Sequence, residues 1–346
     1  MIYFNSDYLE GAHPAVMARL METNMVQTVG YGEDEYCETA REKIKLACQA
    51  PEADVHFLVG GTQTNTTVIA AILRPWQGVL SAVSGHINCH EAGAIESTGH
   101  KVITLPTNNG KITAQQVRDY VEWHKNDEST EHIVQPGMVY ISHPTEGGTL
   151  YSKAELTALY DTCKQYGLPL FIDGARLGYG LVADGSDITL PELARLCDVF
   201  YIGGTKVGAL FGEAVVIMNE ALKKDFRFIM KQRGGRLAKG RLLGIQFDAL
   251  FTDDLYLTIS RHAIDMAYQI REIFVSAGYP LLFDSPTNQQ YPIMPDDELA
   301  EIGKSFGYEY WERVDETHSG VRFCASWATT QENVDALRAA VHALKK

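Results

Sequence analysis

The chain has 346 residues, of which 45% are hydrophobic and 21% charged, and this composition suits a globular protein with one large and one smaller domain. Its formal net charge of -14 argues against nucleic acid or an anionic membrane surface as a partner. The chain shows no apolar run of membrane-spanning length and no signal-peptide pattern, and its six cysteines form no CxxC pair. We therefore expect a cytoplasmic protein.

Short apolar runs alternate with helical patterns between residues 54 and 219, which predicts an α/β fold with a mostly parallel, seven-stranded sheet between helices. Strands are expected at residues 54–61, 78–87, 101–107, 138–143, 169–176, 198–206 and 212–219. The clearest helices are expected at residues 62–73, 113–125 and 152–165. Ser152 and Glu155 form a capping-box signature, and Gly167 should end that helix.

The regular alternation of strand and helix patterns ends at about residue 247, and the pattern that follows predicts a smaller α+β domain. Its expected elements are a helix at 263–276, a strand at 280–284, a helix at 298–306, a strand at 321–327 and a helix from Thr330. The first residues match neither pattern and are interpreted as an arm that packs on the body or on a neighbouring subunit. The predicted division is therefore an arm at 1–30, a large domain at 31–246 and a small domain at 247–346.

Chemistry-bearing residues stand at three predicted strand ends, where ligands bind in open α/β sheets. Gly60, Gly61 and Thr62 lead into a helix whose free N–H groups suit a phosphate, although a plain capped turn explains them equally well. Asp173 and Lys206 end two later strands. A lysine for a Schiff base and an acid for a ring nitrogen are the two groups that pyridoxal phosphate (PLP) requires.

Each of these residues also has a simpler explanation. Asp173 could form a structural salt bridge with Arg176, which lies close in sequence. Lys206 by itself would more often be a solvated lysine. The occurrence of Asp173 and Lys206 on what are predicted to be consecutive strands favours the cofactor interpretation.

Several stretches, in one order over nearly the whole chain, carry a resemblance to a known family. They are FNSDYLEGAHPAV, VGYGEDEY, GGTQTN, SGHINCHEAGAIESTGH, ISHPTEGGTLYSKAEL, FIDGAR, YIGGTK and VRFCASWAT. Together they resemble the PLP-dependent threonine aldolase family, within the fold-type I (aspartate aminotransferase-like) enzymes. The resemblance implies PLP as the cofactor, a homodimer or homotetramer, and aldol cleavage of an L-β-hydroxy amino acid, threonine or allo-threonine, to glycine and an aldehyde.

The resemblance also implies roles for nine residues. For the cofactor, Gly61 and Thr62 would hold the phosphate, His86 would stack on the ring, Asp173 would pair with the ring nitrogen, Arg176 would lie near the ring hydroxyl or the substrate, and Lys206 would form the Schiff base. For the substrate, Ser6 and Arg322 would bind the carboxylate, and His143, with His86 as the alternative, would act on the β-hydroxyl.

Some of these residues fit other interpretations. His86 with Cys89, His90 and Glu91 could bind a metal, but the chain offers no distant second ligand pair, so no metal is expected. Ser6 could cap a turn, and Arg322 could be a surface charge. Residues 178–183 match GxGxxA, a dinucleotide pattern, yet a polar DGSD stretch follows where a helix should begin.

Three positions depart from the family pattern. Pro144 replaces the usual asparagine after the loop histidine, and Thr205 replaces serine but keeps the hydroxyl. Ala238 lies near the position of an arginine that reaches a neighbouring subunit, with Arg236 and Lys239 beside it. The rival reactions are β-elimination, transamination and racemisation with the same cofactor, and a non-catalytic PLP protein is a further alternative.

Overall fold

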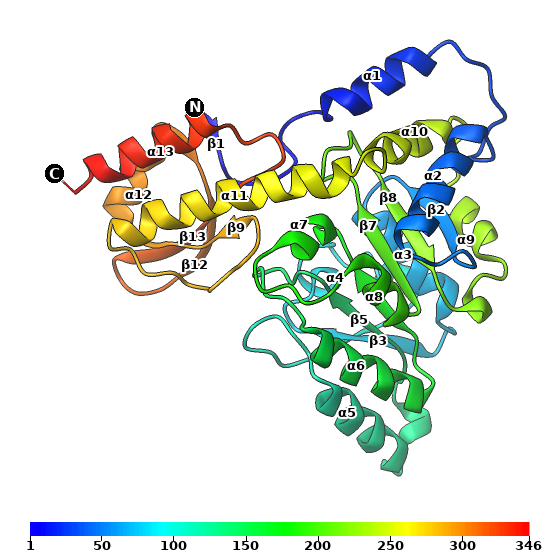
Figure 1. Cartoon of the computed structure of the whole chain (residues 1–346). Coiled ribbons are helices and arrows are strands. Elements are labelled where there is room, and N and C mark those ends of the chain that lie inside the picture. The colour runs from blue at the N-terminus through cyan, green and yellow to red at the C-terminus, as the bar shows by residue number, and fades with distance from the viewer. Residues whose placement is uncertain (346) are drawn as a thin grey trace.

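The computed structural model describes residues 1–345, which form a large helix-covered sheet and a smaller sheet joined by one long helix (Figure 1). The large sheet has the strand order β2-β8-β7-β6-β5-β3-β4. Its strands are β2 (Asp54–Leu58), β3 (Gln77–Ala82), β4 (Val102–Leu105), β5 (Gln135–Ser142), β6 (Leu170–Asp173), β7 (Val199–Gly203) and β8 (Glu213–Ile217). Only β8 runs against its neighbours, so the predicted seven-stranded, mostly parallel sheet is confirmed.

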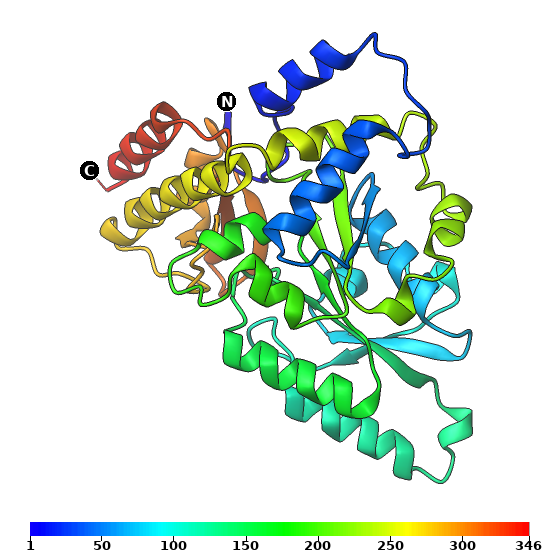
Figure 2. The ribbon, with the colours of Figure 1, turned by 45° about the vertical axis from the view of Figure 1, so that its right-hand side comes forward.

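Helices cover both faces of this sheet because alternate strand residues enter two separate hydrophobic cores (Figure 2). Leu170 and Ile172 of β6 face one core, and Phe171 faces the other. The first core contains α2 (Glu35–Ala47), α5 (Ala114–Asn126), α6 (Lys153–Tyr166), α7 (Leu177–Val182), α8 (Leu190–Arg195) and α10 (Arg241–Leu250). The second contains α3 (Gly61–Ile72), α4 (His86–Cys89) and α9 (Phe226–Gln232).

The three helices predicted from the sequence are present within one residue at each end. Thr113 and Ser152 cap α5 and α6 through complete capping boxes, in which Gln116 and Glu155 bond back to the cap residues. Gly167 ends α6 with φ 66°, a left-handed conformation that glycine adopts without strain. Local signals therefore determine these ends.

The C-terminal part differs more from its prediction. The long helix α11 (Leu255–Ser276) begins before residue 263, and the predicted strand at 280–284 is wrong, because there only Leu281 forms an isolated bridge, with Pro292. The predicted helix at 298–306 ends at Ile302, because residues 306–307 form a strand that pairs with residues 2–3. The elements here are β9 (Gln289–Gln290), β10 (Ile293–Pro295), α12 (Asp296–Ile302), β11 (Phe306–Gly307), β12 (Glu309–Arg313), β13 (His318–Cys324) and α13 (Gln331–Ala343).

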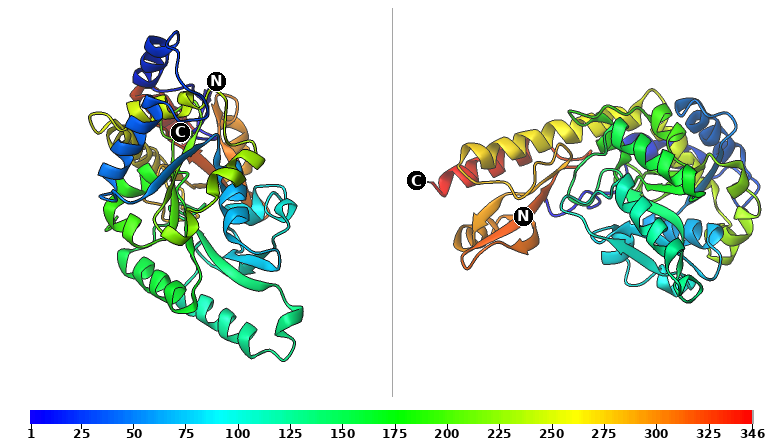
Figure 3. Two further views of the ribbon diagram at one scale, coloured as in Figure 1. Left: turned by 90° about the vertical axis from the view of Figure 1, so that its right-hand side faces the viewer. Right: turned by 90° about the horizontal axis from the view of Figure 1, so that it is seen from below.

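The N-terminal segment touches both parts of the molecule. β1 (Ile2–Tyr3) pairs in parallel with β11, and the Phe4 carbonyl oxygen accepts a hydrogen bond from Cys324 N at 2.6 Å. α1 (Pro14–Thr23) then packs on α10, while α11 spans from the large sheet to the small one (Figure 3). The arm thus packs on the body of its own chain. No helix within residues 1–345 is both long and apolar enough to cross a membrane.

A buried histidine on β2 makes the fold sensitive to acid. Burial, with the charges of Arg227 and Arg41 nearby, lowers the pKa of His56 from 6.5 to about 3. Because the unfolded chain binds this proton and the folded chain does not, stability should fall as the pH drops from about 6.5 towards 3, by up to about 1.4 kcal/mol per pH unit. The ring packs on Phe226 at 4.9 Å between centroids.

We therefore expect His56→Phe, which keeps an aromatic ring there, to flatten the stability profile between pH 7 and pH 4. Urea midpoints at several pH values measure this. His342→Phe is the control, since that histidine lies on the last turn of α13, outside this packing. Equal slopes in the His56→Phe variant and the unaltered chain would contradict the prediction.

Candidate active site

A cavity of about 470 Å³ opens at the carboxyl ends of the parallel strands, within the usual size range of a small-molecule site. Segments that follow β2, β3, β5, β6 and β7 form most of its wall, and Glu309, Trp311 and Arg322 close it from the small sheet. Of the predicted site residues, the cavity brings together Gly61, Thr62, His86, Asp173, Arg176, Lys206 and Arg322. Ser6 and His143 do not line it.

Two glycines allow the ends of β6 and β7 to lie unusually close. A Cβ atom on Gly174 would stand 2.0 Å from the Tyr201 carbonyl oxygen, and one on Gly203 would stand 2.2 Å from that of Ala175. Gly203 N instead donates to the Gly174 oxygen at 3.0 Å. Asp173 and the segment that carries Lys206 therefore reach the same wall of the cavity.

Asp173 is a buried carboxylate surrounded by donors. It accepts hydrogen bonds from the hydroxyls of Tyr140 at 2.6 Å and Tyr201 at 2.5 Å, and also from Asn65 Nδ2 and Ala175 N. Burial would raise the pKa of Asp173, but the charge of His86 and the two tyrosine hydrogen bonds outweigh burial and hold the pKa below its ordinary value. Asp173 is thus ionised and can face a cationic ligand nitrogen.

Arg176 does not pair with Asp173, so that structural alternative is wrong. Its guanidinium binds Asp7 through two hydrogen bonds, from Nε at 2.7 Å and from Nη2 at 3.0 Å. Asp7 also accepts from Asn288, and although burial opposes ionisation, Arg176 and Lys206 lower the pKa of Asp7 to about 2. This buried ion pair ties the N-terminal segment to the end of β6.

Lys206 has a cationic nitrogen without an ionic partner among residues 1–345. The structure gives its Nζ no hydrogen bond or ion pair, and it lies 6.0 Å from the centre of the Tyr8 ring. Burial, together with the charge of Arg176, lowers the pKa of Lys206. A lysine amine that is more easily deprotonated in this way is a better nucleophile.

Three neighbours hold the Lys206 segment in place. Tyr179 donates its hydroxyl to the Lys206 carbonyl oxygen at 2.5 Å. Thr205 donates to Glu213 Oε1 at 2.8 Å and accepts from Gly212 N at 3.0 Å, so the hydroxyl kept at this position has a structural use. Burial raises the pKa of Glu213 to about 8.

His86 belongs to a chain of polar contacts that ends at Asp173. Its Nδ1 lies 2.7 Å from Glu91 Oε1, which also accepts from Asn65, and Asn65 in turn donates to Asp173. Burial would lower the pKa of His86, but the Glu91 hydrogen bond and the charge of Asp173 raise it. Cys89 points elsewhere, with Sγ against the Val83 oxygen, and no cluster of ligating side chains within residues 1–345 could hold a metal ion.

The N-terminus of α3 offers backbone donors to the same cavity. Gly60 precedes the helix without any side-chain cap, so the first N–H groups remain available for a ligand. A Cβ atom on Gly61 would stand 3.2 Å from the Tyr201 hydroxyl, which is the group that bonds Asp173. Glycine at this position therefore keeps backbone and tyrosine close together.

Arg322, on β13, is buried at the other side of the cavity. It donates to Gln289 Oε1 and to the Asn5 carbonyl oxygen, each at 2.9 Å, and its Nη2 also contacts the Glu309 carboxylate. Ser6 is buried and directly follows Asn5 in the chain. Arg322 is therefore buried, and the alternative that it is a surface charge is wrong.

A family model described as beta-eliminating lyase matches residues 4–341, which is nearly the whole chain. The chain belongs to this beta-eliminating lyase family. The low specificity L-threonine aldolase of Pseudomonas aeruginosa is 30% identical, over 96% of this chain and 94% of its own. The same enzyme of Pseudomonas sp. (strain NCIMB 10558) is 28% identical over 99% and 97%. These relatives confirm the resemblance to threonine aldolases.

Solved structures agree with this assignment. Leishmania major threonine aldolase superposes with a TM-score of 0.97 at 41% identity, and the match covers 100% of both chains. Thermus thermophilus aspartate aminotransferase, at 14% identity and a TM-score of 0.71 over 98% and 90%, shares the fold alone. The predicted aspartate aminotransferase-like fold is confirmed.

Several residues that bond Asp173 or line the cavity could not be predicted from the sequence. Asn65, Tyr140 and Tyr201 come from three different elements, and no spacing in the sequence connects them with Asp173. Glu146 and Glu309 also line the cavity. The signal for Glu146 was available, because it lies three positions after His143 in the same stretch.

His143 is buried in the loop wall rather than facing the cavity. Its Nδ1 accepts a hydrogen bond from Tyr151 N at 3.4 Å, and its Nε2 is buried without a partner among residues 1–345. Burial lowers the pKa of His143 to about 4, so the ring is uncharged at neutral pH. Its role at the β-hydroxyl stays a prediction.

Proposed function

We propose that this protein is a PLP-dependent lyase that cleaves an L-β-hydroxy amino acid, threonine or allo-threonine, to glycine and an aldehyde. The observation that carries the proposal is the meeting of Lys206 and Asp173 in one cavity, the first without an ionic partner and the second ionised. The two low specificity L-threonine aldolases from Pseudomonas species support the choice of reaction.

The residues present fit PLP. Lys206 would bind its aldehyde carbon, Asp173 would pair with the ring nitrogen, and His86 would stack on the ring. The uncapped start of α3, with Gly61 and Thr62, would hold the phosphate. When bound, PLP supplies an electron sink for the bond that breaks at the substrate Cα.

The chain's own residues would choose which bond that is. Arg322 and Ser6 would hold the substrate carboxylate, which would replace the Glu309 carboxylate at Arg322, and this would fix the orientation of Cα. Arg176, held by Asp7, would lie near the ring hydroxyl or the substrate. The family description also supports a second candidate, β-elimination, which the same lysine and aspartate would serve.

The deciding experiment is an assay of PLP-loaded protein with L-threonine and L-allo-threonine, in which aldehyde and glycine are both measured. Equal amounts of the two products are expected. A protein that holds PLP, yet gives no aldehyde from these or from larger β-hydroxy amino acids, would contradict aldol cleavage. Ammonia and a keto acid from L-serine would then indicate β-elimination.

We also propose that the protein is a cytoplasmic homodimer or homotetramer. Large apolar side chains on and after α1 support an association between copies, since Met21 is 70% exposed and Met25 is 88% exposed. Light scattering of the purified protein measures the mass of the assembly.

A further inference from the structure

Glu146 lies in the loop that follows β5 and reaches the cavity that also contains His86, Asp173 and Lys206. Its Oε1 accepts hydrogen bonds from Ser142 Oγ at 2.5 Å and from the backbone N–H of His86 at 2.9 Å. Its Oε2 has no hydrogen-bond partner in another residue among 1–345. One oxygen thus fixes the carboxylate, and the other remains available to a bound molecule.

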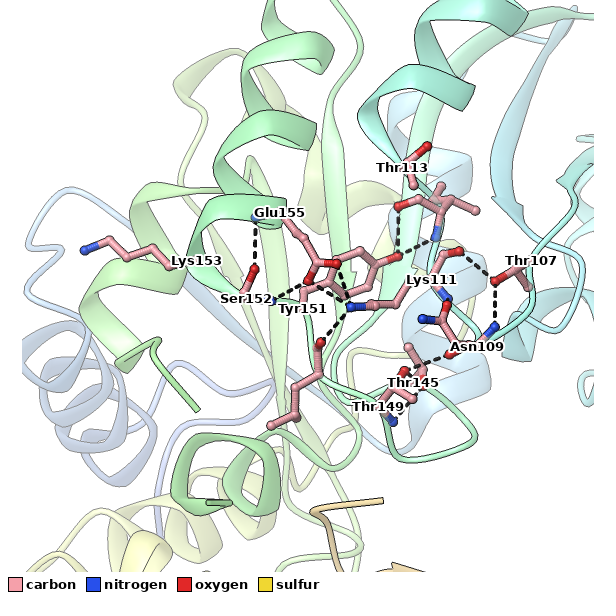
Figure 4. A network of polar contacts seen from close by, with 12 residues as sticks. Thr107, Asn109, Lys111, Thr113, Thr145, Thr149, Tyr151, Ser152, Lys153 and Glu155 are labelled. Atoms are coloured by element: carbon pink, nitrogen blue, oxygen red, sulfur yellow. Dashed lines mark hydrogen bonds and ion pairs between the residues drawn. The ribbon is translucent and has the colours of Figure 1, made fainter. Parts of the chain in front are cut away.

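The loop that carries Glu146 is held from the side of the large sheet by a polar network (Figure 4). Thr145 and Thr149 bond each other through their hydroxyls at 2.7 Å, and Thr149 also bonds the Asn109 carbonyl oxygen at 2.7 Å. Lys111 Nζ joins the Leu150 carbonyl oxygen to Glu155, the glutamate of the α6 capping box. The network restrains the loop on both sides of Glu146.

The C-terminal part holds the same loop from the other side. The Glu146 carbonyl oxygen accepts from the Tyr291 hydroxyl at 2.8 Å and from Gln289 Nε2 at 3.4 Å. Gln289 also accepts from Arg322 Nη1 at 2.9 Å. One amide therefore connects the backbone of Glu146 to the arginine that we propose as the carboxylate site.

The surroundings also suit a group that takes up and returns a proton. Burial raises the pKa of Glu146 above its ordinary value, and the charge of Asp173 acts in the same direction. The hydrogen bond from Ser142 and the charge of His86 lower the pKa but offset only part of this rise. His143 and His86 are less well placed than Glu146 to accept a proton from a molecule in the cavity. His143 does not line the cavity, and Nδ1 of His86 is already engaged by Glu91.

We propose that Glu146 accepts the β-hydroxyl proton of the substrate during aldol cleavage and returns it in the reverse reaction. The inference rests on the proposed function. The O–H proton moves to Glu146 Oε2, the O–H electron pair becomes the second bond of the aldehyde carbonyl, and the Cα–Cβ pair remains with the glycine unit. Cα later takes up one proton, so protons and electrons balance without another reactant.

The test is Glu146→Gln, whose side-chain oxygen can still accept from Ser142 and His86. We expect aldehyde release from L-threonine to fall by about a hundredfold or more. Exchange of the glycine α-proton with deuterium, followed by NMR, should stay within about threefold, because glycine has no β-hydroxyl, and the visible absorption of bound PLP should persist. Glu131→Gln, an exposed carboxylate outside the cavity, is the matched control.

A second variant tests the proton role without removing the carboxylate. Ser142→Ala deletes the hydrogen bond that lowers the pKa of Glu146, so the acidic limb of the pH–rate profile should move to higher pH. An unmoved limb would count against the proposal.

Unchanged aldehyde release in Glu146→Gln would overturn the inference. Equal loss of aldehyde release and of glycine exchange would also overturn it, because Glu146 would then support the site in general. If the unaltered protein exchanged the glycine proton but released no aldehyde, the proposed function would fail, and this inference with it.

Discussion

Lys206→Ala is expected to abolish aldehyde release, with a loss of at least about three orders of magnitude in rate, and to remove the visible absorption of lysine-bound PLP. The reason is the position of its amine, which lies in the same cavity as Asp173 and has no ionic partner among residues 1–345. Reduction with borohydride should attach the cofactor to the unaltered protein and not to the variant, and mass spectrometry of peptides measures this directly.

The same variant should fold normally. In the unaltered protein Nζ of Lys206 makes no hydrogen bond, and burial disfavours its charge. The free energy of unfolding of the cofactor-free protein should therefore change by less than about 1 kcal/mol. Lys101→Ala, an exposed lysine before β4, is the control and should keep both activity and absorption. A Lys206→Ala variant that retained the absorption band and the borohydride-trapped peptide would refute the assignment.

Arg176→Met should cost about 3–5 kcal/mol of folding free energy at pH 7, because it leaves the Asp7 carboxylate buried and unpaired. The side chain of methionine fills similar space, so little of this cost should come from a cavity. Of the two side chains that now donate to Asp7, only Asn288 would remain. Urea unfolding of the cofactor-free protein measures the change.

The pH dependence of this loss separates charge from packing. In the unaltered protein the pKa of Asp7 is about 2, below its ordinary value of 3.8, so this group's contribution is complete above pH 4 and is lost as the pH falls towards 2. Without Arg176 burial would raise that pKa, and the folded variant would gain a proton on acidification. The difference in the free energy of unfolding between the unaltered protein and Arg176→Met should therefore be smaller at pH 5 than at pH 7.

A double variant provides the control for this pair. Asp7→Asn with Arg176→Met removes both charges, and its stability should exceed that of Arg176→Met alone. A double variant as unstable as the sum of the single changes, with no narrowing at pH 5, would show that the cost comes from packing.

The order of the large sheet's strands along the chain and the ends of several helices could be predicted from the sequence. Apolar runs mark its seven strands, and Ser152 with Gly167 marks the ends of α6, because such signals act within a few residues. Asp173 and Lys206 could be placed at one edge for the same reason, since Asp173 ends β6 and Lys206 lies three positions after β7 in a mostly parallel sheet.

The partners of these residues depend on contacts between segments that are far apart in the sequence. Arg176 binds Asp7, 169 positions away, rather than the nearby Asp173. Within one loop, Glu146 faces the cavity and His143 does not, because contacts with Tyr151, Tyr291 and Gln289 set the direction of each side chain. The predicted strand at 280–284 failed for a related reason, since its pairing with residues 291–293 does not extend beyond a single bridge, between Leu281 and Pro292.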